Sequence, residues 1–523
     1  MLFASPYPDI QIPDIPLHEF VLANARDRAR TPALIDGPTG RSLTYAQLAD
    51  GVERFAAGLA AAGCSKGDVF AIVLPNLPEY AIVVFGVSRA GGISTTVNPL
   101  STAGEIRTQL RDSGARRLLT LPPFLSCCRE AVEGTRVQEI FVFGEADGAT
   151  PAAELMATGG RAPEVSVDPA RDLVTLPYSS GTAGVAKGVM LTHRNVVANV
   201  AQAQSLLRTE PADVTLAVAP FFHILGLAVI LAASLHAGAT VITQPRFELD
   251  AFLAAIQRYR VTWLALVPPI MLALATHPLV DRYDLSSLKL AASGGAPLSA
   301  DMEKAAAARL GCTIFQAYGM TETSGVATMP ATREPERIRP GTCGQLLPRT
   351  EARVVDVMTG ADLGPGQDGE LWVRGPQVMA GYLQRPEESR LTLVEGGWLR
   401  TGDIGHFDDY GYVRVADRLK ELIKYKGFQV PPAELEAVLL THPAVADVAV
   451  IPVADDESGE IPKACVVRSD DVTAPELMDH VAARVAHYKR VRRVEFVDSI
   501  PKSATGKILR RQLIFRERAA ASE

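Results

Sequence analysis

Cysteine is scarce in this 523-residue chain, and its pattern excludes two common kinds of stabilisation. The cysteines form neither a CxxC pair nor the spacing of a metal-ligand set, so neither a zinc module nor a disulfide framework is predicted. Scattered cysteines are typical of proteins in a reducing cytoplasm. The six are Cys64, Cys127, Cys128, Cys312, Cys343 and Cys465.

Long apolar runs are also missing. The most hydrophobic stretch, ILGLAVILAASL at 224–235, is too short for a bilayer, which needs about 20 residues, and instead predicts a buried core helix. The N-terminus carries no basic residue before Arg26, so a secretory signal peptide is not expected. We therefore expect a cytoplasmic protein without a membrane span.

The chain lacks an excess of positive charge. Its net charge is −7 and its pI about 5.8, which argues against a general nucleic-acid-binding protein. A hydrophobic content of 47% with 21% charged residues is typical of a globular protein. The length exceeds what one hydrophobic core supports, so two or more domains are predicted.

Hydrophobic periodicity predicts alternating helices and strands in the first two thirds of the chain. Leu48, Val52, Phe55 and Leu59 share one face of a helix predicted over 44–62. Short apolar runs, near-continuous as in sheets covered on both faces, predict strands near 69, 240, 261 and 288. This alternation predicts an α/β fold.

Beyond Leu346 the predicted pattern changes to short strands separated by glycine turns, followed by an α+β unit. We predict a large N-terminal domain, residues 1–417, built of layered αβ subdomains plus a small β-barrel-like subdomain. A small, mobile α+β C-terminal domain is predicted over 418–523.

A glycine-rich loop follows the apolar run LVTLP. The segment YSSGTAGVAKG, 178–188, combines glycines, hydroxyls and a lysine, which suits a loop that holds phosphate through backbone N–H groups. It is not a Walker A loop, because Ala186 precedes Lys187 and Gly188 follows it. Taken alone, such a loop is more often an ordinary surface loop.

Seven further motifs follow this loop in order. They are PFFHILGL (220–227), ASGGAPL (292–298), QAYGMTE (316–322), GELWVRG, WLRTGDIG, DRLKELIKYKGFQV and PKSATGKILRR. Together the eight motifs cover almost the whole chain, and the sequence resembles the acyl-adenylate-forming superfamily. That superfamily includes acyl-CoA synthetases, 4-coumarate–CoA ligases, luciferases and the adenylation domains of peptide synthetases.

The resemblance implies a set of residues that bind ATP and CoA. Asp403 would accept hydrogen bonds from the ribose hydroxyls with the help of Arg418, and the phosphate loop would hold the outer phosphates. The implied cofactor-binding residues are Ser179, Ser180, Gly181, Thr182, Lys187, Gly295, Gln316, Tyr318, Gly319, Asp403, Arg418, Lys424, Lys426, Gly427 and Gln429.

Four residues are implied to be catalytic. Glu322 would bind Mg²⁺ through a hard carboxylate oxygen, Thr321 would donate to the α-phosphate, and His223 would lie beside the acyl carboxylate. Lys507, in the C-terminal tail, would stabilise negative charge as an anionic carboxylate attacks an anionic phosphate. One positive charge about 4 Å away is worth about 4 kcal/mol at an effective dielectric near 20.

The resemblance also implies two conformations. Lys420 occupies the hinge position about which family members rotate the small domain. Lys424 and Gln429 match residues that contact the adenylate, while Lys426 and Gly427 match residues that receive the pantetheine thiol. A bulky residue at 427 is expected to abolish thioester formation and to spare adenylation.

The sequence departs from the resemblance in two places. Ala183 and Ala186 replace a hydroxyl residue and a proline of the phosphate loop, so we expect weaker ATP binding. Leu225 and Val229 replace the tyrosine and serine of plant 4-coumarate ligases, which favours an apolar acid. The predicted acyl-pocket residues are Leu225, Val229, Gly295, Gly319, Gly325 and Val326, with the glycines leaving room for the acyl group.

The leading hypothesis is an AMP-forming ligase that joins a cinnamate-like, aryl or medium-chain acid to CoA. Its substrates would be the acid, ATP and CoA, with Mg²⁺ as cofactor. The basic stretch HYKRVRR, 487–493, and YKGF favour CoA as the acceptor. Alternatives are an enzyme with another acceptor (a carrier protein, an amine, or diazotase-type chemistry), a luciferase-like oxygenase, and a non-enzymatic binding protein.

Overall fold

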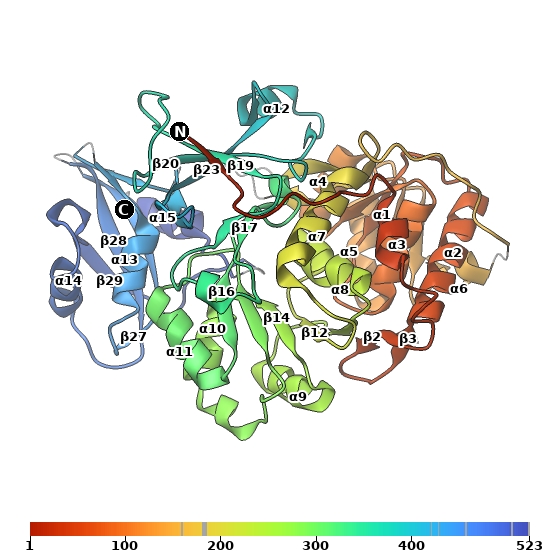
Figure 1. Ribbon diagram of the computed structural model, residues 1–523, viewed down its shortest axis with the longest axis horizontal. Coiled ribbons are helices and arrows are strands. Elements are labelled where there is room, and N and C mark those ends of the chain that lie inside the picture. Colours follow the sequence, from red (N-terminus) through yellow and green to blue (C-terminus); the bar gives the residue numbers. More distant parts are fainter. Residues whose placement is uncertain are drawn as a thin grey trace.

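The computed structural model of the chain describes residues 1–157, 160–179, 186–419, 421–426, 428–455, 458–503 and 506–520. Two large sheets with helices packed against them form the N-terminal part (Figure 1). A third, antiparallel sheet lies above them in this view, and the C-terminal part, drawn in blue, lies at one side. The architecture is therefore the α/β type that the sequence predicts.

The first sheet is parallel at its centre and antiparallel at one edge. At that edge β11 pairs with β10, β9 and β21 (Gly381–Tyr382). Its main strands, in spatial order, are β10 (Tyr178–Ser179), β11 (Lys187–Thr192), β9 (Leu173–Thr175), β5 (Ile93–Thr96), β4 (Val69–Ile72), β6 (Arg117–Thr120), β7 (Glu139–Val142) and β8 (Thr150–Pro151).

The second sheet is parallel except for the edge hairpin of β2 and β3, which comes from the start of the chain. Its described strands, in spatial order, are β16 (Thr313–Gln316), β15 (Leu290–Ser293), β14 (Trp263–Leu266), β12 (Val214–Ala217), β13 (Thr240–Thr243), β2 (Pro32–Asp36) and β3 (Ser42–Thr44). The strands that the sequence predicts near 69, 240, 261 and 288 are confirmed as β4, β13, β14 and β15.

Helices cover both sheets. The predicted helix over 44–62 is α2 (Tyr45–Ala61), and Thr44 begins it with a capping box to Gln47. The other helices of this part are α1 (Leu17–Leu22), α3 (Glu79–Arg89), α4 (Ala103–Ser113), α5 (Pro122–Val132), α6 (Ala152–Ala157), α7 (His193–Leu207), α8 (Ala233–His236), α9 (Leu249–Tyr259), α10 (Pro268–Thr276) and α11 (Ala300–Leu310).

The apolar stretch at 224–235 is buried, as predicted, but most of it is a π-helix, η1 (Leu225–Ala232), that continues into α8. Gly226 lies at its start because a β-carbon there would be 2.1 Å from the carbonyl oxygen of Pro220. Four short 3₁₀ turns also occur in the described residues: η2 (Pro278–Arg282), η3 (Thr321–Thr323), η4 (Pro335–Arg337) and η5 (His487–Lys489).

The small β subdomain predicted after Leu346 is an antiparallel sheet that the N-terminal residues join through β1. Arg418 is the last residue of its strand β24, so this sheet runs one residue past the predicted boundary at 417. The strands are β1 (Leu2–Ala4), β19 (Glu351–Val355), β20 (Gly369–Arg374), β23 (Trp398–Phe407), β22 (Leu393–Val394) and β24 (Val413–Arg418), with β17 (Thr328–Met329), β18 (Gln345–Leu346) and helix α12 (Pro386–Thr392) nearby in the chain.

The C-terminal part has its own sheet and its own buried clusters on both sheet faces. A helix in the tail, α15 (Arg510–Ala520), was not predicted. The other elements are β25 (Ile423–Tyr425), β26 (Phe428–Val430), α13 (Pro432–Leu439), β27 (Val445–Asp455), β28 (Gly459–Arg468), α14 (Ala474–Ala482) and β29 (Arg493–Phe496).

Candidate active site

The predicted motif residues gather where parallel strands of the second sheet end. The segments around His223, Val267, Gly295 and Gln316 follow or close the carboxyl ends of β12, β14, β15 and β16. The carboxyl ends of neighbouring parallel strands lie on one edge of a sheet, where ligands of α/β proteins bind. This edge is the candidate active site.

The carboxylate of Glu322 receives two hydroxyl groups from distant elements. Ser179 Oγ and Tyr382 Oη each donate to Glu322 Oε1 at 2.9 Å. Burial and the nearby Glu322 carboxylate raise the pKa of Tyr382, so its hydroxyl keeps its proton. Glu322 itself is 5% exposed, and the two donors fix the direction of its carboxylate.

The phosphate-loop motif connects two paired strands. Tyr178 pairs with Gly188 and Ser179 with Lys187 across β10 and β11. The ammonium of Lys187 lies 4.8 Å from the centre of the Tyr382 ring, a cation–π distance. The predicted residues Ser180, Gly181 and Thr182, and also Ala183, lie outside the described residues.

Asp403 lies between a tyrosine and an arginine. Tyr318 Oη donates to Asp403 Oδ2 at 2.7 Å, and Arg418 Nε lies 3.2 Å from Asp403 Oδ1. Asp403 and Arg418 face each other across β23 and β24. The Asp403 carboxylate raises the pKa of Arg418, and burial followed by Asp403 raises the pKa of Tyr318 well above its usual value. Each carboxylate oxygen retains acceptor capacity for a ribose hydroxyl.

The carboxamide of Gln316 is used within the protein. Its Oε1 accepts from the backbone N–H of Leu298 at 2.9 Å, and its Nε2 donates to Glu303 Oε2 at 2.8 Å. Glu303 also accepts from the backbone N–H of Gly341 at 3.0 Å, and burial raises its pKa. Gln316 and Glu303 therefore fix the turn at 294–299 against the end of β16.

His223 lies in the turn before η1, with its ring 4.7 Å from that of Phe222. Burial, and secondarily the charge of Lys507, lower the pKa of His223 to about 4. The imidazole is therefore neutral at pH 7. It can donate one hydrogen bond, and it adds no positive charge beside that of Lys507.

Lys507 reaches this edge from the C-terminal part of the chain. Its loop is closed by the Ser503 N–H donating to the Lys507 carbonyl at 2.8 Å. A β-carbon at Gly506 would lie 3.2 Å from Pro269 Cγ, so the loop rests directly on α10. Burial and the charge of Arg418 lower the pKa of Lys507, while Asp403 and Glu322 raise it. Lys507 thus lies in the electrostatic field of Arg418, Asp403 and Glu322, which the sequence predicts for the nucleotide and Mg²⁺ site.

The residues predicted to contact the adenylate or the pantetheine thiol lie in or between the strands β25 and β26. Lys424 is exposed in β25, and its backbone N–H donates to Glu460 Oε2 at 2.8 Å. Lys426 is exposed with a φ of 47°, and its N–H donates to the Ser458 carbonyl at 2.8 Å. Gln429 pairs with Lys424 across β25 and β26. Lys420 and Gly427 lie outside the described residues, and the adenylate, thiol and hinge assignments stay predictions.

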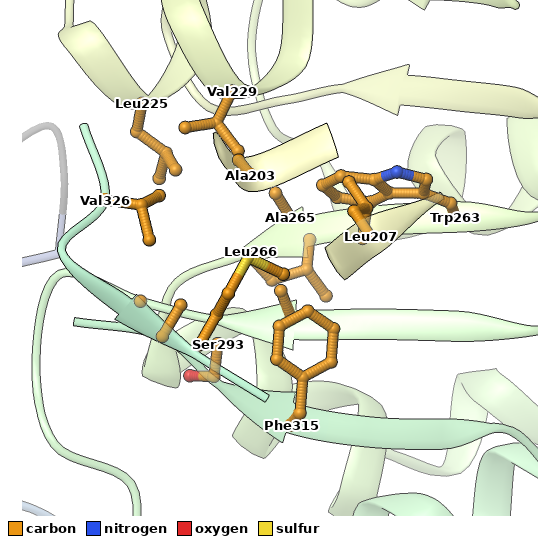
Figure 2. A pocket seen from close by; sticks show the side chains of 14 residues that line it. Ala203, Leu207, Leu225, Val229, Trp263, Ala265, Leu266, Ser293, Phe315 and Val326 are labelled. Atoms are coloured by element: carbon orange, nitrogen blue, oxygen red, sulfur yellow. The ribbon is translucent and has the colours of Figure 1, made fainter. Parts of the chain in front are cut away.

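A pocket opens between the second sheet and the helices α7 and η1 (Figure 2). Its cavity volume is about 30 Å³, within about 410 Å³ of space between atoms that includes open solvent. The predicted residues Leu225, Val229 and Val326 line it, and the side chains drawn in Figure 2 carry almost only carbon toward it. The remaining lining residues are Ala203, Leu207, Trp263, Ala265, Leu266, Ala292, Ser293, Gly294, Phe315, Ala317 and Met329.

The three predicted pocket glycines do not line this cavity. A β-carbon at Gly319 would lie 2.0 Å from the Gly325 carbonyl oxygen, and one at Gly325 would meet Asn199 Oδ1 at 2.9 Å. These two glycines permit close backbone packing with their neighbours, and their role in leaving room for an acyl group stays a prediction. Gly295 has a φ of +83° and only Val267 Cγ1 near its missing side chain, at 3.9 Å.

The described residues contain neither a clustered metal-ligand set nor a membrane-spanning helix. No group of three or more His, Cys, Asp and Glu side chains there could hold a metal ion by itself. Glu322 is therefore a single protein carboxylate, which fits a Mg²⁺ ion that takes its other ligands from phosphates and water. None of the helices in those residues has both the length and the apolar character to cross a bilayer.

The sequence matches two family models in the order that the motifs predict. The model of the AMP-binding enzyme covers residues 21–383, and the model of the AMP-binding enzyme C-terminal domain covers residues 434–507. The chain belongs to the AMP-binding enzyme family. The C-terminal match begins in α13 and ends at Lys507, the residue inserted into the candidate site.

Relatives of this AMP-binding enzyme are similar along the whole chain. The 4-coumarate–CoA ligase 2 of Oryza sativa subsp. japonica is 44% identical over 98% of this chain and 94% of its own. The solved anthranilate CoA ligase AuaEII, in complex with anthranoyl-AMP, is 28% identical with a TM-score of 0.91, covering 98% and 99% of the two chains. The amide bond synthetase McbA from Marinactinospora thermotolerans is 28% identical with a TM-score of 0.85, covering 95% and 99%.

Three residues of this site were not predicted from the sequence. Tyr382 contacts both Glu322 and Lys187, Glu303 holds Gln316, and Trp263 closes one end of the pocket. Tyr382 and Trp263 are aromatic residues within short strands, a pattern that ordinary core residues share. Only Glu303 carried a signal, since a glutamate on the buried face of a helix needs a partner.

Proposed function

We propose that the protein is an AMP-forming acid–CoA ligase acting on a carboxylic acid with an apolar body, either cinnamate-like or medium-chain aliphatic. In the first step a carboxylate oxygen attacks the α-phosphorus of ATP, and pyrophosphate leaves. In the second step the thiolate sulfur of CoA attacks the acyl carbon, the bond to AMP breaks, and a thioester forms. Full-length similarity to 4-coumarate–CoA ligases supports this activity.

The observation that carries the proposal is the position of Lys507. Its loop rests on Pro269 and Val267, from which a β-carbon at the neighbouring Gly506 would lie 3.2 and 3.4 Å away. The charge of Lys507 lowers the pKa of His223, and Asp403 and Glu322 raise the pKa of Lys507. A cation from the small domain is thus available beside the predicted phosphate and ribose contacts. Its charge would stabilise the extra negative charge of the adenylation transition state.

The residues present fit a bound Mg²⁺ at Glu322, where the ion would neutralise charge on the ATP phosphates. Ser179 and Tyr382 orient the carboxylate for this task. Lys187, on the other side of the phosphate loop, would contribute a second cation toward the outer phosphates.

The apolar lining restricts the acid. A ring hydroxyl buried against Leu225 and Val229 would find no partner among the side chains of the wall, at a cost of about 1–3 kcal/mol. Ser293 is the one hydroxyl residue in the described lining, and its buried Oγ has no hydrogen-bond partner there; it ends β15, whereas Leu225 and Val229 belong to η1. The Trp263 N–H donates to Thr209. Cinnamate is therefore expected to be a better substrate than 4-coumarate, by roughly tenfold in kcat/KM.

A pyrophosphate-release screen over cinnamates, benzoates and fatty acids, with and without CoA, tests the proposal. We expect release that depends on the acid and a thioester only when CoA is present. Lys507→Met is expected to lower release by roughly a hundredfold. Lys502→Met is the control, because that lysine pairs with Asp447 at 2.6 Å in the same tail. Absence of release with every acid would refute the proposal.

A second candidate is a ligase that transfers the adenylate to an amine. It is favoured by the structural likeness to the amide bond synthetase McbA, at a TM-score of 0.85. The same screen separates the two when an amine replaces CoA. Amide formed in place of thioester would support this candidate.

A further inference from the structure

The indole of Trp263 lies at the inner end of the acyl pocket. Trp263 begins β14 and pairs with Leu290 of β15, whereas Leu266 and Ser293 pair at the carboxyl ends of the same two strands. Three residues of a strand span about 10 Å. The backbone of Trp263 therefore lies about that far from the edge where the motif residues gather. Its indole lies at the side of the pocket opposite Leu225 and Val326 (Figure 2).

Small residues create the space in front of the indole. Trp263 and Ala265 are two residues apart in β14, so their side chains lie on the same face of the strand. The small side chain of Ala265 leaves the space beside the indole open. A larger side chain at 265 would fill the middle of the pocket. The small lining residues are Ala203, Ala265, Ala292, Gly294 and Ala317.

The indole is held in place by a hydrogen bond to the chain that follows α7. Trp263 Nε1 donates to Thr209 Oγ1 at 3.3 Å, and the Thr209 carbonyl accepts from Gln204 Nε2 at 2.9 Å. Trp263 is 3% exposed. Rotation of the ring would leave a buried N–H without its partner, which opposes any widening of the pocket.

We propose that Trp263, positioned by Thr209, sets the longest acid that the enzyme activates. The inference rests on the proposed function and specifies its substrate class: acids whose apolar body ends before the indole. An acid with a longer acyl chain would have to displace the indole of Trp263, which is buried and donates a hydrogen bond to Thr209.

The test compares straight-chain saturated acids from butanoate to tetradecanoate, with acid-dependent pyrophosphate release as the readout. In the wild type, kcat/KM is expected to rise with chain length and then to fall sharply. In Trp263→Ala the fall is expected at a longer chain, with a gain of roughly tenfold for the first acids beyond the wild-type limit. An unchanged limit in a folded Trp263→Ala variant would overturn the proposal.

Two further variants keep the test decisive if Trp263→Ala does not fold. Thr209→Val removes the hydroxyl that accepts the Trp263 N–H and keeps the side-chain volume nearly constant. We expect kcat/KM for the first acids beyond the wild-type limit to rise severalfold, and the KM values of neighbouring chain lengths to differ less than in the wild type. Ala265→Leu is expected to shift the limit to shorter acids. If both variants keep the wild-type profile, Trp263 does not set the limit.

The outcome is distinguishable from failure of the proposed function. If the wild-type protein releases no pyrophosphate with any acid, the ligase proposal itself is wrong. If it releases pyrophosphate but all variants share one chain-length profile, only the role of Trp263 is wrong. The KM for ATP, measured in parallel, reports on whether each variant has an intact nucleotide site.

Discussion

At the scale of single residues, the most informative contact is the pair of hydroxyls on Glu322. Ser179 belongs to the phosphate-loop motif and Glu322 to QAYGMTE, so the sequence predicts both residues without predicting that they touch. Hydrogen bonds to an ionised acceptor are about twice as strong as neutral ones. The two donors therefore fix the direction of the Glu322 carboxylate.

Tyr382→Phe is expected to raise the KM for ATP by roughly tenfold. The variant removes one hydrogen bond to a charged group, worth about 1.5–3 kcal/mol, and keeps the ring that Lys187 contacts. The measurement is acid-dependent pyrophosphate release at varied ATP concentration.

Tyr283→Phe is the matched control for this variant. Its hydroxyl donates to Asp250 Oδ1 at 2.6 Å near the surface, so the change removes a tyrosine–carboxylate bond away from the site. Equal effects of the two substitutions on the KM for ATP would show that the Glu322 contact has no special role.

At the scale of elements, two buried histidines form hydrogen bonds that link α1 to the helices α3 and α7. His18 Nδ1 lies 3.0 Å from Ser88 Oγ of α3, and His193 Nδ1 accepts the backbone N–H of Leu17 at 3.0 Å. Burial lowers the pKa of His18 to about 3 and that of His193 to about 4. Both rings are therefore neutral in the folded protein at pH 7.

These pKa values predict loss of stability in mild acid. A histidine with a folded pKa below its unfolded value of about 6.5 binds protons more readily when unfolded. Its contribution is complete above pH 6.5 and declines as the pH falls toward the folded pKa. At pH 5 the loss from His18 alone is about 2 kcal/mol.

Urea unfolding at pH 7.5 and pH 5 measures this loss. The His18→Gln variant keeps a side chain that can bond Ser88 but cannot titrate, so its unfolding free energy is expected to fall less between the two pH values. His442→Gln, in the C-terminal part, serves as the control. The same decline in all three proteins would contradict the assignment to His18.

At the scale of the whole molecule, the C-terminal part delivers Lys507 to an edge built by the N-terminal part. Gly506 has a φ of +75°, and a β-carbon there would press on Pro269. The left-handed region costs other residues about 1–2 kcal/mol. The described placement therefore depends on a glycine next to the lysine.

Gly506→Ala is expected to slow adenylation by roughly tenfold, because the strain and the contact with Pro269 oppose this placement of the small domain. Thioester formation from a synthetic acyl-adenylate and CoA is expected to change less. Pyrophosphate release and thioester formation are measured separately.

The control is Gly360→Ala, since Gly360 has a φ of +71° with open space around its missing side chain. The Gly360→Ala variant has the same strain of a left-handed backbone, but its new β-carbon contacts no other residue. If Gly506→Ala slows both half-reactions equally, the lysine loop does not act through the domain arrangement described here.

The α/β class, the strands β13, β14 and β15 of the second sheet and the identities of the motif residues could be predicted from the sequence alone. Local periodicity decides such features, and the chemistry of Glu322, Asp403 or Lys507 is carried by the residue itself. The helix α15 was not predicted, because its basic sequence has a less regular apolar face than that of α2.

The residues that complete the site could not be predicted, because they meet through contacts between distant segments. Tyr382 and Glu322 are 60 residues apart in the sequence, and Trp263 and Thr209 are 54 residues apart. No local sequence pattern predicts either contact. The tertiary structure also decided that the carbonyl of Gly325 fills the space at Gly319. Close packing between segments that are distant in the chain determines both where a pocket remains and which side chain closes it.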